Sequence, residues 1–296
     1  MLVHLSDVEA AAALVAGHVR RTPTIEVAAG DLAAAPLVLK LEHLQRSGSF
    51  KARGAFHVLL RTRPERVVTA SGGNHGLAVA TAARALGIPA EVYVPTTTPA
   101  TKLDGLHALG AEVRPVGTVY AEAAAEAHAH ATAAGLPYLH AYDDPMVVAG
   151  QGTLALELPD VDTVLVAVGG GGLAGGLVAG LAGRARVVCV EPRNCPTLHA
   201  ALAAGEPVDV DVSGVAVDAL GARRVGAVPV ALLRDVSSLL VTDEAIAEAR
   251  AALWRELRLA VEPAAGAALA ALRTGGYRPD PGERVAVVIC GGNAAR

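Results

Sequence analysis

The sequence predicts an α/β fold of two domains, each a mostly parallel sheet flanked by helices. Short valine-rich runs alternate along the chain with longer alanine-rich stretches of helical period. Parallel strands covered by helices on both faces are continuously apolar, which matches the valine-rich runs. With 296 residues, of which 52% are hydrophobic, the chain can bury the large core that this fold needs.

The elements follow one another in the order strand, helix, strand. Ser6 with Glu9 resembles a capping box, Thr98 precedes a first-turn proline, and Asp243 opens a helical run that ends near Trp254. The predicted strands are 37–41, 66–69, 90–94, 112–116, 162–168, 186–190 and 284–290. Residues 66–142 contain consecutive strand–helix units and are predicted to form a small domain, inserted in a larger one made of 1–65 plus 143–296.

Composition and charge narrow the possible partners. The formal net charge is −4 and there is no long basic run, so a small-molecule ligand is expected and a nucleic acid is not. The high hydropathy comes from alanine, and charged residues interrupt the apolar N-terminal stretch, so neither a signal peptide nor a membrane span is predicted. The three cysteines show no disulfide or CxxC pattern, which favours a reducing, cytoplasmic location. His128, His130 and His140 are expected to be solvated, because the first two cannot share a helix face.

A glycine-rich segment, Val168–Leu177, follows a predicted strand and opens a helical run. Glycines allow close backbone approach, and free amides at a helix N-terminus hold a phosphate without a basic side chain. The segment also satisfies the dinucleotide fingerprint, with Gly170, Gly172 and Gly175 followed by Glu191 at the end of the next strand. A single phosphate ester, a dinucleotide, and a tight turn without a ligand therefore remain alternatives.

Two further segments lie between a strand and a helix. In residues 47–55 (SGSFKARGA), Lys51 begins a helix, where a cation opposes the helix dipole. Lys51 is thus either neutralised, for example as an imine, or held for an anion, unless it and Arg53 are simply solvated. In residues 69–76 (TASGGNHG), small residues and exposed amides suit a carboxylate, Asn74 suits a cofactor oxygen, and His75 is favoured as a packing residue.

Together these segments resemble the fold-type II (β-family) pyridoxal phosphate enzymes, whose fold is of the tryptophan synthase β type, and specifically the threonine/serine dehydratase and serine racemase branch. The likeness extends in order over nearly the whole chain. Its motifs are TPT at 22–24, KLEHLQRSGSFKARGA at 40–55, SGGNHGLA at 71–78, VGGGGLAGG at 168–176, VEP at 190–192, VEPAAGAALAAL at 261–272 and VICGGN at 288–293.

The resemblance implies a pyridoxal 5′-phosphate cofactor in the large domain, bound to Lys51 as a Schiff base, and a substrate side formed by the small domain. The implied cofactor-binding residues are Phe50, Lys51, Asn74, Gly169, Gly170, Gly171, Gly172, Leu173, Glu262 and Cys290; the implied substrate-binding residues are Ser71, Gly72, Gly73, Asn74 and His75. Cys290 stands where the family usually has a serine or threonine beside the pyridine nitrogen, so a weak thiol donor replaces a hydroxyl. A homodimer is also implied.

The expected activity is that of a dehydratase (ammonia-lyase), which converts L-threonine, L-serine or both to a 2-oxo acid and ammonia. Lys51 would remove the Cα proton before the β-hydroxyl leaves. A racemase and a 3-hydroxyaspartate-type lyase remain alternatives within the family, and a nucleotide-binding protein remains one from a different class.

Departures from the family pattern refine these expectations. Gly72 replaces the serine that serves serine racemases as a second acid/base, so inefficient racemisation is expected. Thr197 replaces an acidic metal ligand, which leaves only Glu191 as a weak candidate ligand and leaves dependence on a divalent or monovalent cation open. The sequence ends close to CGGN, so no C-terminal regulatory domain is expected.

Overall fold

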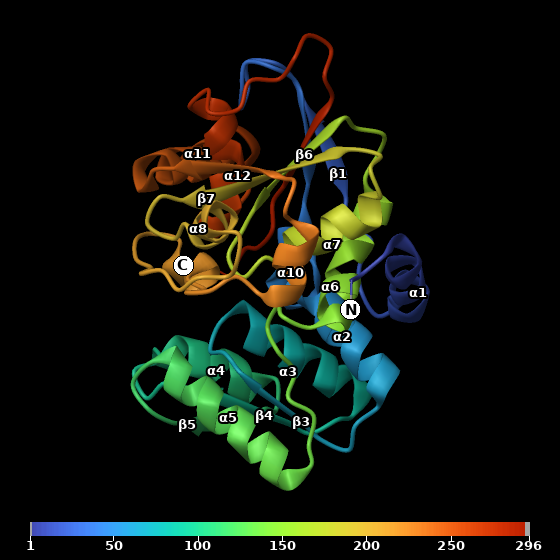
Figure 1. Ribbon diagram of the computed structural model, residues 1–296, viewed down its shortest axis with the longest axis vertical. Coiled ribbons are helices and arrows are strands. Elements are labelled where there is room, and N and C mark those ends of the chain that lie inside the picture. Colours follow the sequence, from blue (N-terminus) through green and yellow to red (C-terminus); the bar gives the residue numbers. More distant parts are fainter. Residues whose placement is uncertain (1, 294–296) are drawn as a thin grey trace.

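The computed structural model describes residues 2–293 and contains two sheets flanked by helices (Figure 1). The large sheet has the strand order β1-β2-β9-β6-β7-β8 and the small sheet has the order β3-β4-β5. Neighbouring strands pair in parallel except β1 with β2, which confirms the predicted fold class. The strands are β1 (Thr24–Val27), β2 (Leu37–Lys40), β3 (Val67–Ala70), β4 (Ala90–Val94), β5 (Glu112–Pro115), β6 (Thr163–Ala167), β7 (Arg186–Pro192), β8 (Ser237–Val241) and β9 (Val285–Val288).

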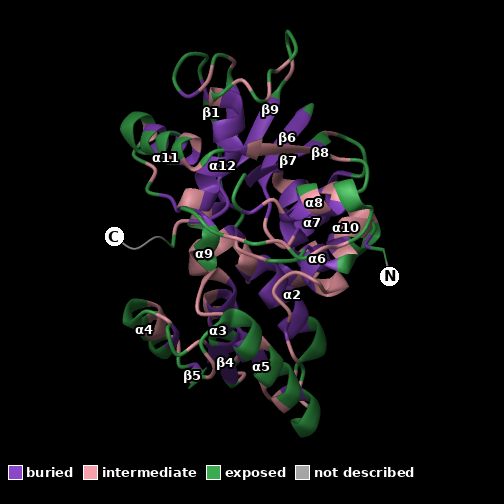
Figure 2. Ribbon diagram, turned by 60° about the vertical axis from the view of Figure 1, so that its left-hand side comes forward, coloured by how far each residue is buried: buried purple, intermediate pink, exposed green. Residues whose placement is uncertain are grey.

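Helices cover both faces of the large sheet and bury its central strands (Figure 2). Helix α12 contacts β6 to β9 and lies against α11, whereas α7 contacts β6 and β7 and is covered by α1 and α6. The helices are α1 (Leu5–Val15), α2 (Lys51–Thr62), α3 (Asn74–Leu86), α4 (Ala100–Ala108), α5 (Tyr120–Ala134), α6 (Pro145–Gly152), α7 (Gly172–Leu181), α8 (Thr197–Ala204), α9 (Val217–Leu220), α10 (Ala227–Leu232), α11 (Asp243–Leu257) and α12 (Pro263–Arg273). Short 3₁₀ turns, Glu42–Leu44, Arg46–Gly48 and Thr153–Glu157, complete the pattern.

Each strand predicted from the sequence is present, with ends within two residues of those predicted. Strands β1 and β8 were not predicted. Both are edge strands with partly exposed side chains, so neither carries the continuous apolar run that marks the buried strands.

Two of the expected helix starts were wrong. Helix α1 begins before Ser6, and Asp7 rather than Glu9 accepts a hydrogen bond from the backbone N–H of its N-cap residue, His4, at 2.9 Å. The N-cap of α4 is Pro99 and not Thr98. The helical run from Asp243 is present as α11.

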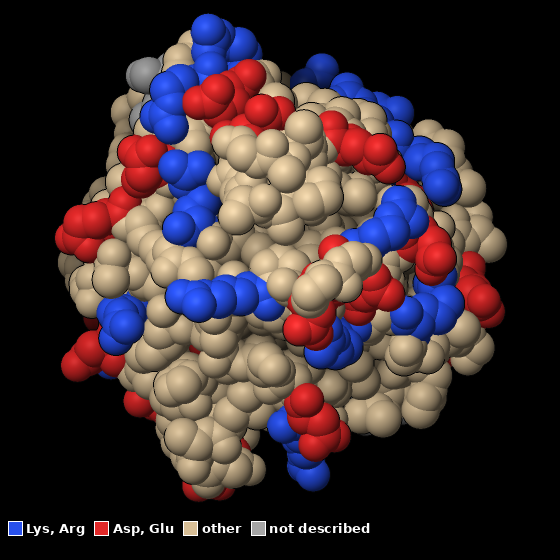
Figure 3. Space-filling model, turned by 90° about the horizontal axis from the view of Figure 1, so that it is seen from above, with Lys and Arg blue, Asp and Glu red and all other residues tan. Residues whose placement is uncertain are grey.

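The small sheet and helices α3, α4 and α5 lie within residues 66–142, although the domain boundary itself stays a prediction. Helix α2 contacts both α3 and α6. The amide of Phe50, just before α2, donates to the carbonyl oxygen of Cys290, just after β9, so the N-terminus of α2 lies at the end of the large sheet. Basic and acidic side chains are interspersed on the face shown in Figure 3. Within residues 2–293, no helix has both the length and the apolar character needed to cross a membrane.

Candidate active site

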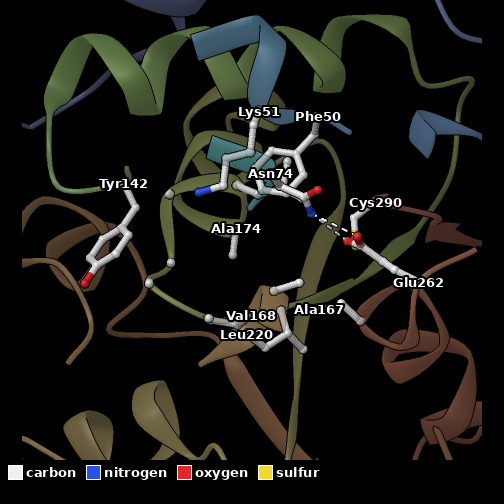
Figure 4. A pocket seen from close by; sticks show the side chains of 17 residues that line it. Phe50, Lys51, Asn74, Tyr142, Ala167, Val168, Ala174, Leu220, Glu262 and Cys290 are labelled. Atoms are coloured by element: carbon white, nitrogen blue, oxygen red, sulfur yellow. Dashed lines mark hydrogen bonds between the residues drawn. The ribbon is translucent and has the colours of Figure 1, made fainter. Parts of the chain in front are cut away.

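A pocket lies between the N-termini of α2, α3 and α7 and the carboxyl end of β6 (Figure 4). All the residues expected to bind the cofactor line it, although they come from segments far apart in the sequence. This position is typical, because ligands of open α/β sheets bind in the crevice outside the carboxyl ends of the strands.

Lys51 is the first residue of α2 and points into the pocket. Its Nζ donates a hydrogen bond to the carbonyl oxygen of Ala141 at 2.8 Å. Burial lowers the pKa of this amine to about 8, opposed by the nearby Cys290 and Glu262. The lowered pKa gives Lys51 a larger fraction of neutral, nucleophilic amine near physiological pH than a solvated lysine has.

The glycine loop ends at the N-terminus of α7, with Gly171 at φ +90° as its N-cap. Among the described residues, the amides from Gly169 to Ala174 donate to no protein acceptor, as expected for the first turn of a helix. A Cβ at Gly171 would lie 2.7 Å from Pro229 Cβ, and one at Gly169 would lie 3.0 Å from Leu220 Cα. Close packing thus requires glycine, and the free amides point to an anion.

Asn74 and Glu262 face each other at the other end of the pocket. Asn74 Nδ2 donates to both carboxylate oxygens of Glu262, at 2.9 and 3.0 Å, and Asn74 Oδ1 accepts from Asn293 Nδ2 at 2.8 Å. Burial raises the pKa of Glu262, while the hydrogen bond from Asn74 opposes this shift. The Asn74 amide is therefore held in one orientation by partners on both sides.

Cys290 lies beside this pair and is buried. Burial and the neighbouring Glu262 carboxylate raise the pKa of its thiol, so Cys290 is neutral at physiological pH. A neutral thiol can donate only a weak hydrogen bond to a ring nitrogen.

Arg53 lies two residues after Lys51 and is fully buried, so the alternative of a solvated Arg53 was wrong. Its guanidinium donates to Glu42 at 2.6 and 3.0 Å and to Glu157 at 2.6 and 3.0 Å. Lys40 Nζ donates to the same Glu157 carboxylate at 2.6 Å. This cluster of two cations and two carboxylates is electrically balanced, and it anchors the first turn of α2 beneath the pocket.

The expected substrate-side residues are only partly brought to the pocket. Asn74 lines it, whereas Ser71, Gly72, Gly73 and His75 do not. Ser71 Oγ accepts from the Gly73 amide at 3.1 Å. The ring Nε2 of His75 lies 3.0 Å from the Leu139 carbonyl, and burial lowers its pKa to about 3, so this ring is neutral and engaged in packing, as favoured from the sequence.

Glu191 faces the N-terminus of α8 and not the glycine loop. Its carboxylate accepts from the amides of Leu198 and His199 at 2.7 and 2.8 Å, and burial raises its pKa to about 7. The acidic residue of the dinucleotide fingerprint is thus engaged elsewhere. Within residues 2–293, no group of three or more His, Cys, Asp and Glu side chains could hold a metal ion.

Sequence reasoning missed Tyr142, a part of the pocket wall that comes from the chain returning from the small sheet. Ala219 and Leu220, at the end of α9, also line the pocket. The Asp144 carboxylate caps α6 by accepting hydrogen bonds from the amides of Met146 and Val147. An aromatic residue two positions before this cap was a usable signal for Tyr142.

The fold and the pocket, in which a part-buried lysine amine lies near a loop of free amides, suit an enzyme that binds a phosphorylated aldehyde. The chain belongs to the pyridoxal-phosphate dependent enzyme family, whose model matches residues 15–291. It is 37% identical over 271 residues to an L-threonine ammonia-lyase of Geobacter sulfurreducens, covering 87% of this chain and 67% of that protein. It is 36% identical to the human serine dehydratase-like protein, covering 92% of this chain and 90% of that one. The structure of maize serine racemase superimposes with a TM-score of 0.94 at 28% identity, covering 100% of this chain and 95% of that one.

Proposed function

We propose that this protein is a pyridoxal phosphate-dependent ammonia-lyase that converts L-threonine, L-serine or both to the 2-oxo acid and ammonia. The observation that carries the proposal is the meeting, in one pocket, of the lysine amine with lowered pKa and the free amides of the glycine loop. The relatives named as threonine ammonia-lyase and serine dehydratase-like support the choice of substrate.

The pocket offers a partner for each polar group of pyridoxal phosphate. The amides from Gly169 to Leu173 would hold the phosphate and Lys51 would bind the aldehyde carbon. Asn74 would contact the ring hydroxyl, and the Cys290 thiol would face the ring nitrogen. When bound, the cofactor supplies an electron sink that makes the substrate Cα proton acidic.

Lys51 performs the proton transfer in this proposal. The Lys51 amine would remove the Cα proton of the bound substrate, and the carbonyl of Ala141, which accepts a hydrogen bond from Lys51 Nζ, would orient the amine. Loss of the β-hydroxyl as water and hydrolysis then give 2-oxobutanoate from threonine, or pyruvate from serine, with one ammonia. The neutral Cys290 favours prompt loss of the β-substituent over a long-lived carbanion.

The direct test is to measure ammonia and 2-oxo acid release from L-serine, L-threonine, their D-enantiomers and 3-hydroxyaspartate. Stoichiometric release from an L-hydroxyamino acid supports the proposal. Turnover of 3-hydroxyaspartate alone, or of none of these compounds, would refute it.

A racemase is the second candidate, because the fold matches that of a serine racemase closely. Against it, position 72 carries no hydroxyl, and a Cβ there would lie 2.9 Å from Thr98 Cγ2. We therefore expect D-serine to form from L-serine at least about tenfold more slowly than pyruvate, because position 72 supplies no second acid. Chiral chromatography beside a pyruvate assay measures the ratio, and D-serine formation at an equal or higher rate would favour the racemase.

The pKa of Lys51 determines how the rate of cofactor capture should depend on pH. Only the neutral amine attacks an aldehyde, so the rate at which cofactor-free protein captures pyridoxal phosphate should rise with pH around a midpoint near 8. Replacing Glu262 by glutamine should move this midpoint down, because the Glu262 charge raises the Lys51 pKa. Stopped-flow absorbance from pH 6 to 10 measures both, and a midpoint at the ordinary lysine value would contradict the role of burial.

We also propose that the protein acts as a homodimer in the cytoplasm, supported by the family resemblance and by the three unpaired cysteines. Light scattering of the purified protein tests the first point, and fractionation of the source cells tests the second.

A further inference from the structure

Tyr142 lies beside the glycine loop, in the connection between the small sheet and α6, and the mechanism above gives it no role. Its ring lies against Gly170, where a Cβ would overlap with the ring carbons. A Cβ at Gly172 would lie 3.1 Å from Tyr142 Cβ. In Figure 4 the ring stands across the pocket from Glu262 and Cys290. Gly170 therefore leaves room for an aromatic ring as well as for an anion.

The hydroxyl of Tyr142 reaches a third segment, residues 224–228, which leads into α10. It donates to the carbonyl oxygen of Arg224 at 3.1 Å. Asp143 Oδ1 accepts from the Val228 amide at 2.8 Å, and the amide of Gly226 donates to the carbonyl oxygen of Gly170 at 3.1 Å. Three segments therefore meet around Tyr142. The chain that contains Tyr142 packs against the glycine loop, and both are hydrogen-bonded to residues 224–228.

We propose that Tyr142 is a positioning residue for the cofactor phosphate, one that holds the glycine loop with its amides presented to the pocket. The inference rests on the proposed function. The ring supplies a rigid surface to a loop that has no side chains of its own, and the hydrogen bond to Arg224 fixes the ring. Lys51 Nζ donates to Ala141 and the Tyr142 hydroxyl donates to Arg224, so Tyr142 acts on retention of the cofactor and not on proton transfer.

The test is to measure pyridoxal phosphate binding to cofactor-free protein, by absorbance titration and by the rate of cofactor release. Tyr142→Ala should raise the dissociation constant roughly tenfold or more and speed cofactor release by a similar factor. Tyr142→Phe keeps the ring but loses the bond to Arg224, so it should release cofactor a few times faster. Tyr138→Phe is the matched control, because Tyr138 lies in the same connection but its ring contacts His128 and His140.

A double-mutant cycle separates the proposed contact from a general loss of stability. Gly170→Ala should weaken cofactor binding strongly, because its Cβ overlaps with the Tyr142 ring. In the Tyr142→Ala background, Gly170→Ala should raise the dissociation constant for pyridoxal phosphate much less. If Gly170→Ala raised the dissociation constant equally in both backgrounds, the proposal would be overturned. A dissociation constant of Tyr142→Ala within about twofold of wild type would also overturn it.

If Tyr142→Ala does not fold, as judged by thermal unfolding, the rate at which Tyr142→Phe releases the cofactor tests the proposal instead. A wild-type release rate would refute the role of the hydrogen bond to Arg224. Wild-type protein that binds no pyridoxal phosphate refutes the proposed function itself. Normal wild-type binding without an effect of Tyr142 refutes only this inference.

Discussion

Replacing Lys51 by alanine is expected to abolish the visible absorbance of the bound cofactor and to reduce turnover by more than about 10³-fold. The loss is this large because one amine both binds the aldehyde and moves the Cα proton, and the other amines are placed elsewhere. Lys40 is engaged with Glu157, and Lys102 lies 3.1 Å from Asp218. The measurements are an absorbance spectrum and a 2-oxo acid assay.

Lys102→Ala is the matched control and should keep the visible band. Borohydride reduction followed by peptide mapping should place the cofactor on Lys51 in wild type and in Lys102→Ala. A Lys51→Ala protein with wild-type dehydratase activity would refute the assignment of Lys51.

Replacing Arg53 by methionine should destabilise the protein by about 3–5 kcal/mol, because two buried carboxylates would share the single charge of Lys40. Arg53→Lys restores the charge but not the forked contacts to Glu42 and Glu157, so it should lie between wild type and Arg53→Met. Denaturant unfolding of the cofactor-free proteins measures these differences.

Arg66→Met is the comparison for this prediction, since Arg66 pairs with Glu91 and Glu112 but its side chain is 37% exposed. Its loss should cost no more than about 1 kcal/mol. If Arg53→Met were no more destabilising than Arg66→Met, the buried cluster would not anchor α2 as inferred.

Local patterns were sufficient for much of the fold. Strands β2, β3, β4, β6, β7 and β9 are buried on both faces, so their apolar runs identify them without knowledge of their neighbours. The edge strands β1 and β8 are half-exposed, and they exist because a partner strand lies beside them. The capping residues expected from the sequence did not fix where α1 and α4 begin. Helix α1 begins at Leu5 after the N-cap His4, and α4 begins at Ala100 after the N-cap Pro99.

The sequence by itself provided the chemical groups of the pocket: an amine at Lys51, a glycine loop from Gly169 to Gly172 suited to an anion, and an amide at Asn74. These follow from residue type and from position between a strand and a helix, which are local properties. Only the tertiary structure decided what surrounds them. Tyr142 packs against the glycine loop, Arg53 is buried between Glu42 and Glu157, and Glu191 accepts hydrogen bonds from the N-terminus of α8. Such contacts join segments far apart in the chain, and packing selects them after the strands and helices have formed.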